Sequence, residues 1–178
     1  MKKYSLLMIF AVVFLSITTC KNDKDDNLER WMIANLTAFN AIKTNPEYKE
    51  LKSAGNEGSI YYKVLEKGNG TDSIRYTSRV RCFYKGYFIA EYPEYKIKSG
   101  TVFDQRLFDD GPAAIFAVNG VIGGWKTALQ HMVKGDKWEI WIPYQLGYGR
   151  SGSSSSIPGY STLVFEMEII DVASVDNF

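Results

Sequence analysis

The side chains that most often carry chemistry are scarce in this chain. His131 is the only histidine, and Cys20 and Cys82 are the only cysteines. Without a Cys-x-x-Cys pair or a cluster of cysteine and histidine, neither a zinc site nor a histidine-based hydrolase triad is expected. Because no acid–base pair stands out either, the sequence points away from hydrolysis, and we predict no metal and no cofactor.

Aromatic residues are the more prominent candidates for a site. Phe103, Trp125 and Phe165 would, taken singly, be more typical of a hydrophobic core than of a binding pocket. Asp104, which follows Phe103, is equally typical of a turn or a cap, and Tyr148 of a core tyrosine with a satisfied hydroxyl. The surrounding sequence must therefore decide between these interpretations.

Helical spacing dominates the segment before the strands. Apolar residues from Leu28 to Ile42 predict an amphipathic helix over about residues 27–43. Asn45-Pro46-Glu47 combines a cap residue with a proline in the first turn, which predicts a second short helix that ends near Gly55 and Gly58. We therefore predict a helical segment over residues 28–56.

From Gly58 onward the hydrophobic pattern changes to a period of two. It predicts strands over residues 60–65, 79–84, 137–142 and 163–170. One short helix interrupts them, because Trp125, Leu129 and Met132 share a face and Gly135 follows. Cys82 lies in an apolar run and is expected to be a buried thiol. Several strands around one short helix favour an antiparallel α+β domain over residues 57–178.

Four stretches of this domain carry a recognisable pattern: Phe83-Tyr84-Lys85-Gly86, Gly100-Thr101-Val102-Phe103-Asp104, Val121-Ile122-Gly123-Gly124-Trp125, and Ile142 to Gly149 followed by Ile157-Pro158 and Thr162 to Glu166. With these stretches together and in this order, the sequence from about Gly58 to Val172 resembles the FKBP family of peptidyl-prolyl cis-trans isomerases. The resemblance implies an FKBP-like fold, in which an antiparallel sheet wraps around a short helix.

The resemblance also implies a proline pocket and its residues. Trp125 would form the floor, and the Ile122 backbone N–H would bond a substrate carbonyl. The polar members, which we take as the catalytic candidates, are Tyr84, Asp104 and Tyr148. The remaining substrate-binding residues would be Phe103, Val121, Ile122, Ile157 and Phe165. The implied partners are proline-containing polypeptides and macrolides of the tacrolimus and rapamycin type.

Such a pocket suits isomerisation of the X–Pro bond. Rotation faces a barrier of roughly 18–20 kcal/mol because the planar amide is stabilised by resonance. An apolar, water-poor site favours the twisted, less polar transition state. No bond breaks, so neither a nucleophile nor a metal is needed.

Two departures from the family pattern concern the pocket. Residues 87–99 form a longer connection than usual, which predicts an extended hairpin beside the pocket mouth. An aromatic that many relatives place on the pocket wall is replaced by Ala114, and Phe116 could compensate. These departures keep open a non-catalytic chaperone or binding module, and a dimer paired through the N-terminal helix is a further alternative.

The first residues have the layout of an export signal. Lys2 and Lys3 precede an apolar stretch that ends shortly before Cys20. This resembles the bacterial lipoprotein signal, which predicts a signal peptide over residues 1–19 and lipidation of Cys20. The alternative is a plain signal peptide that leaves Cys20 an ordinary thiol.

Residues 20–27 would be the lipidated cysteine and a solvated tether. Its acidic run resembles a surface-export signal, or is only a spacer. The expected location is thus the outer membrane, on its periplasmic or surface face. Lysine and arginine total 21 against 20 aspartate and glutamate residues, which provides no basic excess for nucleic acid.

Overall fold

The computed structural model describes residues 23–93, 96–153 and 156–173. In chain order, the helices and strands are α1 (Asp23–Ile42), β1 (Lys49–Lys52), β2 (Ser59–Glu66), β3 (Arg79–Phe88), β4 (Val102–Arg106), β5 (Ala114–Ala117), α2 (Gly123–Leu129), β6 (Lys137–Ile142) and β7 (Leu163–Ala173). Short 3-10 turns η2 (Phe108–Asp110), η3 (Val118–Gly120) and η4 (Tyr144–Leu146) lie in the connections.

The described strands form one antiparallel sheet in the order β1-β2-β6-β7-β3-β4, and β5 also pairs with β3. The long central strands β3 and β7 pair from Arg79 with Ala173 to Phe88 with Leu163. Along β3, buried and half-buried residues alternate without a break, which is the period-two pattern that predicted this strand. Cys82 is a buried free thiol, as predicted.

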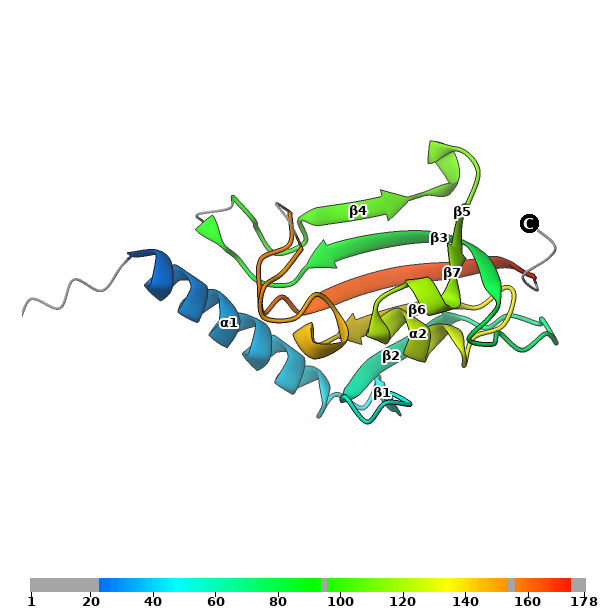
Figure 1. Cartoon of the computed structure of the whole chain (residues 1–178), viewed down its shortest axis with the longest axis horizontal. Coiled ribbons are helices and arrows are strands. Elements are labelled where there is room, and N and C mark those ends of the chain that lie inside the picture. Colours follow the sequence, from blue (N-terminus) through cyan, green and yellow to red (C-terminus); the bar gives the residue numbers. More distant parts are fainter. Residues whose placement is uncertain (1–22, 94–95, 154–155, 174–178) are drawn as a thin grey trace, which may run out of the picture.

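Helix α2 fills the inside of the sheet. Figure 1 shows it lying against the strands, with β5 beside it. Its buried residues include Trp125, Ala128 and Leu129, and these join the large core cluster with residues of β3, β6 and β7. The predicted α+β architecture, a sheet wrapped on one short helix, is confirmed.

Helix α1 packs onto the same domain. Figure 1 shows it running from one end of the molecule toward β1 and β2. Trp31, Asn35, Phe39 and Ile42 are all buried, at spacings of one helical turn. The helix begins at Asp23, so residues 23–27, which we predicted to belong to the tether, are helical.

The second short helix predicted after Asn45 is wrong. Asn45 instead accepts a hydrogen bond from the Glu47 amide through Oδ1 (3.0 Å), which makes a turn. The chain then enters β1, where Lys49 pairs with Tyr62 and Lys52 pairs with Ser59. Pairing with β2 satisfies the backbone of this mostly exposed segment, and its side chains carry no period-two signal.

The close meeting of β3 with two phenylalanines yields a stability prediction. A Cβ on Gly86 would stand 2.5 Å from Phe165 Cε1 and 2.7 Å from Phe103 Cζ. Because one ring must move, Gly86→Ala is expected to lower the free energy of unfolding by about 2 kcal/mol, as measured by urea denaturation. Gly120→Ala, whose Cβ would meet only Ala117 at 4.0 Å, is the control and should change it by less than about 0.5 kcal/mol. Equal stability of Gly86→Ala and the wild type would contradict this packing.

Candidate functional site

An aromatic cavity of about 280 Å³ lies between α2 and the sheet. Its lining comes from β3, β4, β5, β7, the turn before α2, α2 itself and the turn after β6. The lining residues are Tyr84, Asp104, Phe116, Gly120, Val121, Ile122, Trp125, Tyr148 and Phe165. Most of these side chains are apolar, which suits a small apolar group of a ligand.

Trp125 forms the floor of this cavity. Its ring centroid lies 5.2 Å from the rings of Tyr84, Phe116 and Phe165, and the interplanar angles are 80°, 76° and 85°. Edge-to-face packing of this kind is favoured by the charge distribution of aromatic rings. Three walls therefore stand nearly perpendicular to the floor.

The depth of the floor is set by a glycine at the start of α2. A Cβ on Gly124 would lie 2.4 Å from Cγ2 of Ile142. Only a residue without a side chain lets the helix approach β6 this closely. Trp125, which follows, is consequently held deep in the molecule, with an exposed fraction of 4%.

The polar groups lie at one side of the cavity. The Tyr84 hydroxyl donates to Asp104 Oδ2 at 2.9 Å. Burial raises the pKa of Tyr84, and the hydrogen bond to Asp104 and the charge of that carboxylate add to the effect. Burial and the charge of Asp104 also raise the pKa of Tyr148, whose side chain is 39% exposed. Both hydroxyls therefore keep their protons at neutral pH.

A β-bulge in β4 gives two consecutive residues, Phe103 and Asp104, different roles near the site. Gly86 pairs with Asp104 and Tyr87 pairs with Val102, so Phe103 has no partner of its own. A bulge changes the direction of a side chain locally. Here Asp104 accepts a hydrogen bond from Tyr84, while the ring of Phe103 packs edge-to-face with that of Phe165, at 5.4 Å between centroids and 89° between planes.

The backbone at Ile122 supplies a further polar group. Ile122 is the N-cap of α2, and its carbonyl accepts the bond from the Lys126 amide at 3.1 Å. N–H groups at the start of a helix have no acceptor within the helix. Ile122 itself lines the cavity, so its N–H is the candidate donor to an incoming carbonyl.

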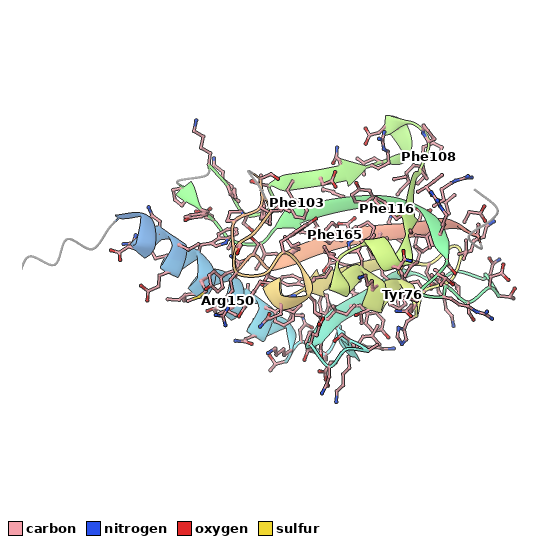
Figure 2. The ribbon with its side chains drawn as sticks, in the orientation of Figure 1. Tyr76, Phe103, Phe108, Phe116, Arg150 and Phe165 are labelled. Carbon is pink, nitrogen blue, oxygen red and sulfur yellow. The ribbon has the colours of Figure 1, made fainter. Side chains whose placement is uncertain are left out.

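The structure brings together seven of the nine residues that the sequence singled out for the pocket. Among the described residues, the lining does not include Phe103 or Ile157. Phe103 supports Phe165, as Figure 2 illustrates, and Ile157 is buried in the core cluster. Phe116 and Gly120 do line the cavity. Phe116 was expected only as a compensation for Ala114, and Gly120 was not singled out from the sequence.

The described residues of the long connection after β3 do not line the cavity. In its described part, Tyr92 pairs with Ile97 and stacks on Trp31 of α1 at 5.2 Å and 18°. The hairpin expected beside the pocket mouth therefore packs against the N-terminal helix.

Among the residues that the structure describes, no group of three or more histidine, cysteine, aspartate or glutamate residues is placed to hold a metal.

Comparison with known families decides the assignment. The model of the FKBP-type peptidyl-prolyl cis-trans isomerases matches residues 70–170, which include every residue of the cavity lining. This chain belongs to that family. The cavity between α2 and the sheet, with Trp125 as its floor, lies wholly within the matched region.

Individual relatives agree with the family assignment. The chain is 43% identical over 116 residues to the FKBP-type 22 kDa peptidyl-prolyl cis-trans isomerase of Escherichia coli, which covers 65% of this chain and 51% of the relative. It is 35% identical over 132 residues to the isomerase Mip of Coxiella burnetii, covering 74% and 50%. The chain thus spans about half the length of these relatives.

Solved FKBP structures share the fold. A peptidyl-prolyl cis-trans isomerase from Pseudomonas syringae pv. tomato is 32% identical, with a TM-score of 0.66 over 82% of this chain and 96% of that one. FkpA from Escherichia coli is 28% identical, with a TM-score of 0.69 over 85% of this chain and 63% of that one.

The raised pKa of Tyr84 predicts a pH dependence of folding. A hydroxyl whose pKa is higher in the folded chain than in the unfolded chain contributes stability below about pH 10, and that stability is lost as the pH rises through the folded value. Tyr84→Phe should therefore reduce the fall in the free energy of unfolding between about pH 10 and pH 12, as measured by urea denaturation at each pH. The exposed Tyr76→Phe is the control. If the free energy of unfolding falls equally steeply with pH in Tyr84→Phe and in the wild type, the Tyr84 hydroxyl does not have a raised pKa in the folded chain.

Proposed function

We propose that the chain is a peptidyl-prolyl cis-trans isomerase that acts on X–Pro bonds of polypeptides. The observation that carries this proposal is the perpendicular aromatic enclosure of the cavity by Tyr84, Phe116, Phe165 and Trp125. A proline ring fits such a site, since it is compact, apolar and lacks a backbone N–H. The membership of the chain in the FKBP family supports the same conclusion.

Catalysis follows from binding the twisted amide better than the planar one. In the twisted state the nitrogen is no longer conjugated and the carbonyl is less polar. An apolar enclosure therefore raises the free energy of the twisted amide less than that of the planar ground state. Trp125 and the three aromatic walls hold the pyrrolidine ring in place. The rest of the peptide can then rotate about the bond while the ring stays fixed.

The polar groups orient the substrate. The Ile122 N–H donates to a substrate carbonyl, and the protonated Tyr148 hydroxyl at the rim can donate to a second one. The Tyr84 hydroxyl donates to the Asp104 carboxylate at 2.9 Å and so holds it in place at the cavity. No proton is transferred in this mechanism, so the reaction needs no acid or base with a pKa near 7.

Macrolides of the tacrolimus and rapamycin type are proposed ligands of the same cavity. They would compete with proline peptides, because both would place an apolar ring over Trp125 and a carbonyl near Ile122. Phe116 supports this proposal, since it stands 5.6 Å from Tyr84 and 5.2 Å from Trp125 and completes the wall beside Ala114.

The cellular setting is proposed from the sequence alone. The signal peptide of residues 1–19 and the lipidated Cys20 would place the enzyme on the outer membrane, where it would assist the folding of exported proteins. Both features lie outside the described residues. Among the helices that are described, none is long and apolar enough to cross a membrane. Because α1 begins at Asp23, the folded part would lie close to the lipid.

The alternatives are less well supported by the geometry. The chaperone alternative was motivated by Ala114 and by the long connection, yet Phe116 fills the wall and the connection lies at α1. Pairing of two copies through α1 stays a prediction, testable by light scattering. The apolar face of this helix covers its own domain, where Trp31 is 1% exposed and Phe39 is 6% exposed.

The proposed function is tested by isomerisation of a short X–Pro peptide with the soluble chain from Lys21 onward. Wild type should act above the uncatalysed rate and be blocked by rapamycin. Tyr148→Phe and Asp104→Asn should each lower kcat/KM about tenfold, because each removes one polar interaction from the site.

Phe108→Ala is the matched control. Phe108, labelled in Figure 2, is 79% exposed, lies in η2 and packs against Phe83, and neither residue lines the cavity, so its removal should leave kcat/KM unchanged. A folded wild type without turnover would refute the enzymatic proposal and leave a binding module.

A further inference from the structure

The buried face of α1 contacts the segment that carries one side of the pocket. We name residues 147–162, without the undescribed 154–155, the pocket loop. Trp31 Nε1 donates to the Gly159 carbonyl at 3.0 Å. Asn35 Oδ1 accepts a bond from the Thr162 amide at 2.8 Å, and the Asn35 carbonyl accepts one from the Thr162 hydroxyl at 3.2 Å.

These contacts are fully buried and polar. Trp31 and Asn35 have exposed fractions of 1% and 0%. Asn35 Nδ2 also donates to the Trp31 carbonyl at 2.9 Å, so the amide side chain is bonded on both sides. A buried amide is tolerated only when its hydrogen bonds are made. The contact therefore fixes one relative position of α1 and the pocket loop, which apolar packing alone would not do.

The fixed position extends from Gly159 to the pocket rim. The two arms of the loop touch, since a Cβ on Gly159 would lie 1.9 Å from the Arg150 carbonyl oxygen. The Tyr160 amide donates to the Gly149 carbonyl at 3.0 Å. Tyr148, which lines the cavity, directly precedes Gly149. A shift of the segment around Gly159, which Trp31 bonds, must therefore move the segment that carries Tyr148.

The long connection after β3 holds Trp31 itself. Tyr92 stacks on one face of the indole at 5.2 Å and 18°, and Phe88 meets it edge-on at 5.7 Å and 74°. These two rings fix the direction in which the indole N–H points. The additional length of residues 87–99 thus has a structural use in placing the donor to Gly159.

We propose that α1 positions the pocket for catalysis, and that Trp31 and Thr162 are positioning residues that hold Tyr148 at the rim through the pocket loop. This inference rests on the isomerase function proposed above. It predicts that loss of the Trp31 N–H affects the turnover step rather than only the folding of the chain.

The test compares substitutions at the contact between α1 and the pocket loop with one near the C-terminal end of α1. Trp31→Phe keeps an aromatic ring but removes the donor, and Thr162→Val removes only the hydroxyl. Phe39→Leu is the matched control, because Phe39 packs on Tyr61 in a separate cluster. For each variant, kcat and KM for an X–Pro peptide, the hydrogen exchange of the Tyr160 amide and Tm are measured on the chain from Lys21 onward.

The expected result separates positioning from stability. Trp31→Phe should lower kcat about fivefold, the effect of one hydrogen bond, with little change in KM and faster exchange at Tyr160. Thr162→Val should act in the same direction, by about twofold. Phe39→Leu should lower Tm but leave kcat and the Tyr160 exchange at their wild-type values.

Three results would overturn the inference. The first is that Trp31→Phe and Thr162→Val keep the wild-type kcat and the wild-type hydrogen exchange of the Tyr160 amide. The second is a loss of kcat in Phe39→Leu as large as that in Trp31→Phe. The third is a loss of kcat in Trp31→Phe without faster hydrogen exchange of the Tyr160 amide. If Trp31→Phe does not fold, Thr162→Val decides the question alone. If the wild type itself shows no turnover, the isomerase proposal fails. Unchanged hydrogen exchange of the Tyr160 amide in both variants would separately refute the positioning of the pocket loop by α1.

Discussion

The perpendicular packing of Trp125 against three aromatic rings is the interaction on which the site depends. It requires α2 to lie close to β6, which the absence of a side chain at Gly124 permits. It also requires β3 and β7 to present Tyr84 and Phe165 on the same inner face, which their antiparallel pairing provides. The short helix and the curved sheet together make an enclosure that stays open to a small apolar ring but holds few polar groups.

The few polar groups at the cavity interact with neighbouring protein groups. Burial and the charge of Asp104 keep the tyrosine hydroxyls at the cavity protonated, so they can donate hydrogen bonds. The N-terminal helix belongs to the same unit, since Trp31 and Asn35 bond to the pocket loop in the interior. A helix outside the matched family region 70–170 is thereby connected to the pocket.

Much of the fold could be predicted because its signals are local. The alternation along β3, β6 and β7 reflects one buried face, and four stretches taken together, which contain Asp104 and Trp125, indicated the family. Other features depend on the partner strand or helix. The four-residue β1 has no apolar alternation and forms only because β2 offers it a backbone to pair with. The bulge at Phe103 breaks the period of two, so sequence spacing could not show that Phe103 supports Phe165 while Asp104 lines the cavity.

The central claim is that this cavity lowers the barrier to X–Pro rotation, and exchange NMR of an unmodified peptide tests it most directly. Without a catalyst, the cis and trans forms interconvert over tens to hundreds of seconds, too slowly to give exchange peaks. Addition of the folded protein at about one-thousandth of the peptide concentration should produce cis–trans exchange peaks within roughly a second, and rapamycin should remove them. Unchanged peptide spectra in the presence of the folded protein would contradict the account.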